Sequence, residues 1–211
     1  MKEYKLPIGC DVPETIILAD GDFPSHPLAL EWLRQCPYVV CCDGAANTYI
    51  RSGRMPEAIV GDGDSLLPDI KERYASLIHS EAEQETNDLS KAFRFCLSQE
   101  RKRITIMGAT GNREDHTIGN VSLLADYMEQ AEVSMMTDYG IFVPIREDSM
   151  FESYIGQQIS VFNMNSTALS AEGLAYPLSV FTNWWQGTLN EALARHFIIR
   201  TEGKVLVFRV F

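Results

Sequence analysis

The stretch YVVCCDGAANTYIRSG, from Tyr38 to Gly53, decides the expected fold. Its first part is an unbroken apolar run, typical of a strand that is buried on both faces. Its second part is a helical segment that ends at Gly53. Between them stands Asp43-Gly44, so a carboxylate follows the end of the strand. A strand that leads directly into a helix predicts one unit of a parallel α/β sheet.

The same alternation extends in both directions from this unit. Further strands are predicted at residues 15–20, 57–62 and 103–109. Further helices are predicted at residues 28–35, 87–99 and 115–130, the last with Asp115 as its N-cap. Strands that alternate with helices predict a doubly wound, mostly parallel sheet, and we expect this α/β domain to span residues 1–137.

The pattern changes after residue 137. Short β-rich runs separated by turns occupy the C-terminal third, and only the segment LNEALAR (residues 189–195) suggests a helix. The β-rich runs are GIFVPI, QQISVFNM, LSVFTNWW, HFIIR and KVLVFRVF. They predict a small all-β domain of sandwich or barrel type over residues 138–211.

Composition limits the classes of function. The chain has 211 residues, a formal net charge of −11 and 45% hydrophobic residues, as in globular proteins with a sizeable core. Its acidity argues against nucleic-acid binding, which requires a basic surface.

The cysteines lack zinc-binding spacing and predict buried free thiols; they are Cys10, Cys36, Cys41, Cys42 and Cys96. Because no signal sequence or membrane-spanning stretch is found, we expect a cytoplasmic protein that does not bind membranes.

Carboxylates and glycines gather in the loops that follow the predicted strands. The loops are Asp20-Gly21-Asp22, Asp43-Gly44, Asp62-Gly63-Asp64-Ser65 and the segment from Gly108 to His116. One such loop is an ordinary turn, since Asp and Gly are common turn residues. Because the carboxyl ends of parallel strands meet at one edge, where open α/β sheets bind ligands, four of them predict a binding site.

The closely spaced carboxylates of Asp62 and Asp64 predict a cation site. The two side chains repel each other, and Gly63 lets the chain turn so that both can reach one cation. Oxygen ligands without histidine or thiolate suit magnesium, which completes its coordination with water and substrate phosphates.

Two further segments each have two interpretations. Asp88 and Lys91 lie at the start of a predicted helix, where an acid is favoured by the helix dipole and the lysine can simply be exposed. The loop from Gly108 to His116 leads into a predicted helix and can donate backbone N–H groups to phosphate. Arg113 in this loop has a guanidinium that can donate two hydrogen bonds to phosphate oxygens. It is neither a Walker A loop nor a dinucleotide fingerprint, and His116 could equally form a structural hydrogen bond.

The adjacent residues Trp184 and Trp185 lie in the β-rich tail. Neighbouring strand residues face opposite sides of a sheet, so at most one of the two rings can enter the core. The other is an interface residue or a stacking surface for a flat ligand.

The order of four motifs, CDGAAN, VGDGDS, ETNDLSKAF and GATGNREDHTIGN, followed by LSAEGLAYPL in the tail, resembles the thiamine pyrophosphokinase family. The resemblance covers nearly the whole chain. It implies transfer of a pyrophosphoryl group from ATP to the hydroxyl group of thiamine, which gives thiamine diphosphate and AMP with magnesium as the cofactor. It also implies a homodimer that shares its active sites between chains and takes small-molecule substrates only.

The resemblance also implies three groups of site residues. Those implied in catalysis are Asp43, Asp62, Asp64, Asp88 and Lys91, with the metal on Asp62, Asp64 and Asp88. The ATP and phosphate site is expected at Asp20, Gly21, Asp43, Gly44, Ser65, Asn87, Lys91, Gly108, Gly111 and Arg113. The thiamine site is expected at Arg113, Asp115, His116, Tyr176, Trp184, Trp185, Thr188 and Asn190.

The chain departs from the family pattern at several positions. Gly63 stands where a phenylalanine is usual, and Asn87 stands where a threonine is frequent. Thr188-Leu189-Asn190 matches the expected Ser-Asn pair only loosely. These departures leave the set of carboxylates intact.

Two other functions fit part of the pattern. Asp62-Gly63-Asp64 resembles the nucleophile loop of phosphatases of the haloacid dehalogenase type, although that family places this loop after its first strand. A non-catalytic nucleotide-binding module would explain the loops but not so many carboxylates, which repel phosphate unless a metal intervenes.

Overall fold

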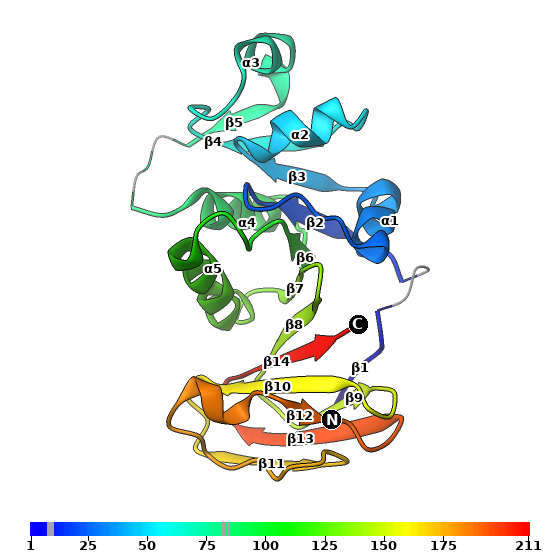
Figure 1. Cartoon of the computed structure of the whole chain (residues 1–211). Helices are drawn as coiled ribbons and strands as arrows, with labels where there is room; N and C mark the ends of the chain where they lie inside the picture. The colour runs from blue at the N-terminus through cyan, green and yellow to red at the C-terminus, as the bar shows by residue number, and fades with distance from the viewer. Residues whose placement is uncertain (8–10, 82, 84) are drawn as a thin grey trace. The chain divides into compact units, whose positions relative to one another are not determined.

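The computed structural model describes residues 1–7, 11–81, 83 and 85–211. The chain divides into two compact units, traced in Figure 1: an α/β unit that ends at Asp138, and a β unit formed by Tyr139–Phe211 together with the first strand. That strand, β1 (Lys2–Tyr4), pairs in parallel with β9 (Ser149–Glu152). The prediction that residues 1–137 form one domain is therefore wrong for β1, because hydrophobic periodicity does not show which distant strand is the partner.

The α/β unit is built on a sheet with strand order β7-β6-β2-β3-β4-β5, in which every pairing is parallel. The strands are β2 (Thr15–Leu18), β3 (Val39–Cys42), β4 (Ala58–Gly61), β5 (Ile78–Ser80), β6 (Arg103–Met107) and β7 (Glu132–Met136). All residues of β2, β3 and β4 are buried, which explains their unbroken apolar sequences. The chain runs from β2 outward to β5 and then returns to β6, so the strand order reverses between β2 and β6.

Helices cover both faces of this sheet. They are α1 (Pro27–Gln35), α2 (Ala45–Arg51), α3 (Pro68–Arg73), the short 3₁₀ turn η1 (Ala75–Leu77), α4 (Asp88–Ser98) and α5 (Glu114–Tyr127). Figure 1 shows α4 and α5 on one side of the sheet and α1 and α2 on the other, as right-handed crossovers require when the strand order reverses. The apolar face of α4 is buried against the sheet through Leu89, Ala92, Phe93 and Cys96.

The β unit consists of two sets of paired strands around one core. The first has the order β12-β10-β14-β8 and the second β1-β9-β13-β11. The remaining bounds are β8 (Gly140–Ile145), β10 (Gln158–Asn163), β11 (Ala168–Glu172), β12 (Asn190–Glu191), β13 (His196–Glu202) and β14 (Val205–Val210). Both sets contribute to one hydrophobic cluster, in which the rings of Phe151 and Phe197 stack with centroids 5.0 Å apart.

Two predictions in the C-terminal third are wrong. The run LSVFTNWW forms no strand; instead Trp184–Gly187 is a 3₁₀ turn, because the side chains of Asn183 and Gln186 form a capping box at its start. The segment LNEALAR is not a helix, since Leu189 has a left-handed φ of 62° and β12 pairs with β10. The expected class, a mixed α/β fold with a second β-rich domain, is confirmed.

The expected thiols are free where the structure describes them. Cys41, Cys42 and Cys96 are buried, Cys36 is half-buried, and Cys10 lies outside the described residues. Burial raises the pKa of the Cys96 thiol to about 12, so this sulfur stays protonated at neutral pH. No helix in the described parts of the chain is long and apolar enough to cross a membrane.

Candidate active site

A cavity of about 500 Å³ opens at the carboxyl ends of the strands of the α/β unit. It lies where the strand order reverses, because residues after β2 and after β6 both line it. The site residues predicted from the sequence that line this cavity are Asp20, Gly21, Asp43, Asp62, Ser65, Asn87, Asp88, Lys91, Gly111, Arg113 and His116. The predicted residues of the same unit that do not line it are Gly44, Asp64, Gly108 and Asp115. The loops after four parallel strands thus converge as expected from their sequence.

Asp43 is the most buried carboxylate of the cavity, with 3% of its surface exposed. Its Oδ2 accepts a hydrogen bond of 3.0 Å from the backbone N–H of Ser65, whereas no donor among the described residues reaches Oδ1. Burial raises the pKa of Asp43, and the negative charges of Asp88, Asp62 and Asp64 raise it further. An unpaired, buried carboxylate oxygen surrounded by like charges is stabilised by a proton or by a bound cation.

Asp20 follows β2 and lines the same cavity, although it is more exposed than Asp43. Its pKa is also raised, first by burial and then by the charges of Asp43 and Asp88. Gly44, at the start of α2, leaves the space that the Asp20 carboxylate occupies, since a Cβ there would overlap Asp20 Oδ2. Gly44 therefore shapes the site without lining it.

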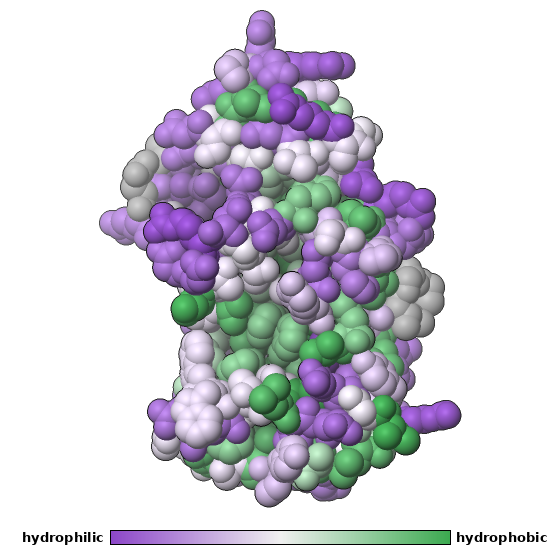
Figure 2. Space-filling view, viewed as in Figure 1, coloured by the Kyte–Doolittle hydropathy of each residue, from purple (hydrophilic) through white to green (hydrophobic). Residues whose placement is uncertain are grey.

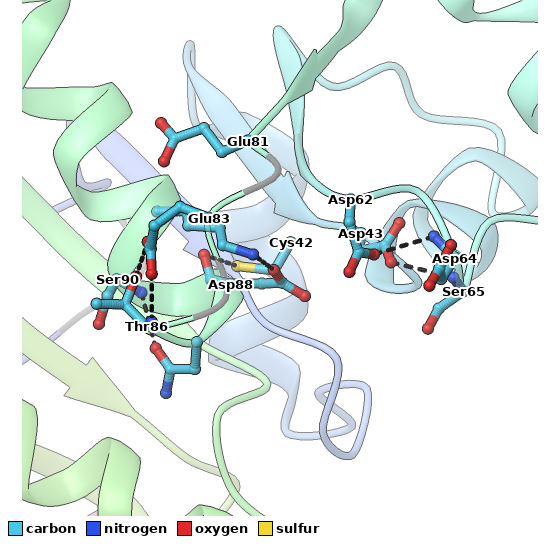
Figure 3. Close-up of polar contacts among 12 residues, drawn as sticks. Cys42, Asp43, Asp62, Asp64, Ser65, Glu81, Glu83, Thr86, Asp88 and Ser90 are labelled. Atoms are coloured by element: carbon cyan, nitrogen blue, oxygen red, sulfur yellow. Dashed lines mark hydrogen bonds and ion pairs between the residues drawn. The ribbon is translucent and has the colours of Figure 1, made fainter.

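The Asp62-Gly63-Asp64 loop does not direct both carboxylates into the cavity. Asp62 lines it, but Asp64 is exposed, and its backbone N–H donates to Asp62 Oδ1 over 3.1 Å. Figure 3 shows Asp62 beside Asp43 and Asp64 beside Ser65. Gly63 adopts a left-handed φ of 79°, and its carbonyl accepts a hydrogen bond from Lys71 Nζ at 3.0 Å. Within the described residues, no group of three or more His, Cys, Asp or Glu side chains is placed to hold a metal ion by itself.

Asn47, which the sequence analysis did not select, fixes this loop from helix α2. Its Nδ2 donates to the carbonyl of Ser65 over 2.8 Å, and its Oδ1 accepts from the N–H of Leu67 over 3.0 Å. Together with the bond from Ser65 to Asp43, these contacts hold the loop against the end of β3. The only sequence signal is its place in the motif CDGAAN, within the first turn of α2.

Lys91 is a buried cation beside the carboxylates, with 3% of its surface exposed. Its Nζ donates to Asp88 Oδ1 at 3.0 Å within the first turn of α4. Burial alone would lower the pKa of Lys91, but the hydrogen bond and the charges of Asp88, Asp62 and Glu83 raise it above its ordinary value. The ammonium therefore stays charged in the cavity, so Lys91 is not the exposed lysine of the alternative interpretation.

The loop between β6 and α5 forms another wall of the cavity. Gly111 has a left-handed φ of 82°, and a Cβ at this position would overlap the carboxylate of Asp22, so only glycine fits. Arg113 is the N-cap residue of α5. The prediction of Asp115 as N-cap is wrong, because its carboxylate instead pairs with Arg113 through bonds of 3.0 and 2.6 Å. Arg113 lines the cavity, while Asp115 does not.

The first turn of α4, which lines the cavity through Asp88 and Lys91, is joined to this loop by two asparagines. Asn87 is the N-cap of α4 and donates through Nδ2 to Asn120 Oδ1 at 3.2 Å. Asn120, on α5, donates in turn to the carbonyl of Ala109 at 2.9 Å. Asn120 was missed because its partners are distant in the sequence and one of them is a backbone carbonyl. Other lining residues that were missed include Cys42, Thr86, Leu89, Ala109 and Asn112.

The predicted residues of the β unit lie around the turn at Trp184–Gly187. Tyr176, Trp184 and Trp185 are all exposed, and the ring of Trp184 packs nearly perpendicular to that of Phe162 with centroids 6.2 Å apart. Asn190 is buried and holds the backbone of Tyr176 through its Oδ1, at 3.1 Å from the N–H, and its Nδ2, at 2.8 Å from the carbonyl. Thr188 Oγ1 donates to the carbonyl of Trp185 at 2.7 Å. Figure 2 shows green hydrophobic residues at the surface of the β unit.

Family models match both units of the chain. The model described as "Thiamin pyrophosphokinase, catalytic domain" matches residues 29–136. The model described as "Thiamin pyrophosphokinase, substrate-binding domain" matches residues 140–208. The gap between the two matches coincides with the division of the structure after Asp138.

Curated relatives match part of the chain. "Thiamine pyrophosphokinase 1" of Oryza sativa subsp. japonica is 30% identical to it over 49% of this chain and 49% of the relative. "Thiamine pyrophosphokinase" of Bacillus subtilis (strain 168) is 34% identical over 39% of this chain and 40% of the relative. The chain thus matches about half, or less, of the length of these relatives.

Solved structures match nearly the whole chain. "Thiamin pyrophosphokinase from Candida albicans" has a TM-score of 0.80 and 18% identity, over 100% of this chain and 93% of that one. A thiamine pyrophosphokinase from Bacillus subtilis has a TM-score of 0.78 and 21% identity, over 93% of this chain and 98% of that one. At these identities the likeness shows a shared fold.

Proposed function

Because the chain belongs to the thiamine pyrophosphokinase family, we propose that it transfers a pyrophosphoryl group from ATP to the hydroxyl group of thiamine. The products are thiamine diphosphate and AMP. The observation that carries this proposal is the cavity in which four aspartates, one buried lysine and a glycine-bearing loop meet at the point where the strand order reverses. None of the relatives described above is a phosphatase or a non-catalytic nucleotide-binding protein, and the Asp62-Gly63-Asp64 loop follows the third strand of the unit rather than the first.

Magnesium fits the carboxylates of this cavity. Asp43 Oδ1 lacks a donor among the described residues, and burial, followed by like charges, raises the pKa values of Asp43 and Asp20. Magnesium needs only one or two protein carboxylates, since water and substrate phosphates complete its coordination. We propose that one or two of the cavity carboxylates Asp43, Asp62 and Asp88 would hold it together with water and phosphate oxygens, and we place Asp64 outside its coordination. When bound, the ion neutralises charge on the phosphates of ATP.

The remaining groups of the cavity act on the phosphates by position and charge. The ammonium of Lys91 is buried and is held in place by Asp88, so it supplies a positive charge at a fixed position, shielded from solvent. The backbone around Gly111 and the guanidinium of Arg113 offer N–H groups to phosphate oxygens from the opposite wall. Phosphoryl-type transfers draw most of their catalysis from such positioning and charge neutralisation.

The β unit supplies the aromatic surface for thiamine in this proposal. Tyr176 and Trp185 are exposed, and Asn190 and Thr188 hold the backbone that presents them. A pyrimidine ring and a cationic thiazolium both suit an aromatic face.

We further propose that the protein is a homodimer with shared sites. The free thiols of Cys41, Cys42 and Cys96 support a reducing compartment such as the cytoplasm.

Purified protein incubated with ATP, magnesium and thiamine is expected to form AMP and thiamine diphosphate in equal amounts, measured by chromatography. Omission of magnesium should abolish both products, because the carboxylates then repel the phosphates of ATP. Failure with thiamine but success with another alcohol would keep the chemistry and change the substrate. ATP hydrolysis to ADP without an acceptor would contradict the proposal.

Two inactive variants are expected to restore activity when mixed, if each site contains residues from both chains. The pair is Asp43→Asn in the α/β unit and Trp185→Ala in the β unit, combined under conditions that allow subunit exchange. A heterodimer would then hold one doubly damaged site and one intact site, so transfer activity should reappear. If mass measurement shows exchange and the mixture stays inactive, each site belongs to a single chain.

A further inference from the structure

The side chains of Asn87 and Asn120 form a link between the two walls of the cavity. Asn87 Oδ1 accepts a hydrogen bond of 2.9 Å from the N–H of Ser90 and so caps α4, while its Nδ2 donates to Asn120 Oδ1 at 3.2 Å. Asn120 Nδ2 then donates to the carbonyl of Ala109 at 2.9 Å. One continuous chain of hydrogen bonds therefore runs from the start of α4 through α5 to the loop after β6.

Each wall carries groups that face the same cavity. The first turn of α4 holds Asp88 and Lys91, and the loop after β6 leads to Gly111 and Arg113. Asn87 and Asn120 line the cavity as well. The link is thus placed to set the separation between the Asp88–Lys91 pair and the phosphate-binding loop.

Residue 87 needs an amide for this link. A threonine, which is frequent at this position in the family pattern, can cap a helix through its hydroxyl but has no second polar group to reach Asn120. Asparagine caps α4 with its oxygen and keeps its nitrogen for the neighbouring helix. Capping and linking can therefore be separated experimentally.

We propose that Asn87 and Asn120 are a positioning pair that, in this chain, sets the separation between the two walls of the cavity during pyrophosphoryl transfer. This inference rests on the proposed function. The contact between the two amides is exposed to solvent, where water replaces a lost hydrogen bond, so it contributes little to the stability of the fold. Its contribution is to the geometry of the occupied site, where small displacements have large effects on rate.

A double-mutant cycle with Asn87→Thr and Asn120→Ala tests the pair. Asn87→Thr should lower kcat about tenfold with a nearly unchanged melting temperature, because the cap remains. Asn120→Ala should lower kcat by at least as much, since it also frees the carbonyl of Ala109. The double variant should be no slower than Asn120→Ala alone. Effects that multiply, or a normal kcat in Asn87→Thr, would overturn the inference.

Two further measurements keep the outcome unambiguous. Asn120→Ser removes the amide that bonds Asn87 and Ala109 and adds no charge to the cavity, so it replaces Asn120→Ala if that variant does not fold. The dissociation constant of magnesium–ATP, measured by calorimetry, should show the same non-additivity; additive changes in it would count against the pair. Inactivity of the wild-type protein would contradict the proposed function, whereas an active wild type with additive variants would contradict only the pairing.

Discussion

The variant Asp43→Asn is expected to lose pyrophosphoryl transfer by about 10²- to 10³-fold while its melting temperature without metal rises. The loss follows because Asp43 is the buried carboxylate with an unpaired oxygen, and charge stabilisation of this kind contributes several kcal/mol to catalysis. Asparagine keeps the acceptor for the Ser65 N–H and tolerates the left-handed φ of 32°. The backbone of the loop should therefore stay in place.

The gain in stability has a defined pH dependence. Burial and the neighbouring acids raise the pKa of Asp43 in the folded protein above its ordinary value of 3.8. As the pH rises past that value, the unfolded chain loses the proton first, so the free energy of unfolding of the wild type falls until the folded group also ionises. The neutral amide of the Asp43→Asn variant carries no such cost, so the advantage of this variant should be absent in acid and fully developed at neutral pH.

Two other variants provide the comparison for Asp43→Asn. Asp126→Asn, on the exposed end of α5 outside the cavity, should retain activity close to that of the wild type. Asp64→Asn should lose less activity than Asp43→Asn, because Asp64 is exposed and does not line the cavity. An Asp64→Asn variant that is as inactive as Asp43→Asn would return the metal to the pair Asp62 and Asp64.

Lys91→Met is expected to lower kcat by about 10²-fold or more and to raise the KM for ATP. The substitution preserves most of the buried side-chain volume but removes the ammonium that lies 3.0 Å from Asp88. Asp88 then loses its partner and adds an uncompensated negative charge to a cavity that must hold phosphates. Steady-state kinetics at varied ATP, with circular dichroism to verify the fold, provide the measurement.

The matched control for Lys91→Met is Lys102→Met, which removes an exposed lysine of the same unit outside the cavity. Its kinetics should equal those of the wild type within about twofold, as for most surface substitutions. Equal losses in the two variants would show that the overall charge of this acidic protein matters, rather than the position of Lys91.

The α/β unit could be predicted from sequence because its signals are local. Buried runs such as Val39–Cys42 stand next to amphipathic helices, and the loops at strand ends meet at one edge by the geometry of parallel sheets. The convergence of Asp20, Asp43 and Asp62 on one cavity follows from this rule alone, whereas Asp88, in the first turn of α4, was expected there only from the family resemblance.

The missed features depend on partners that are distant in the sequence. Strand β1 pairs with a strand far along the chain, with Lys2 opposite Ser149, and periodicity carries no information about such a partner. Asn47 and Asn120 act through backbone carbonyls, which have no sequence identity of their own. The turn at Trp184–Gly187 has the sequence pattern of a strand because its apolar and aromatic residues are also frequent in sheets.

The fate of the β-phosphorus of ATP tests the central claim most directly. In pyrophosphoryl transfer, the hydroxyl group attacks the β-phosphorus, and the bond from this atom to the oxygen that bridges it to the α-phosphorus breaks. The β- and γ-phosphorus atoms therefore leave the nucleotide together. With ATP labelled at the β-phosphorus, magnesium and thiamine, we expect the label in thiamine diphosphate and none in the nucleotide product, which should be AMP. Label that remains in ADP, with or without a monophosphorylated thiamine, would contradict the proposed function.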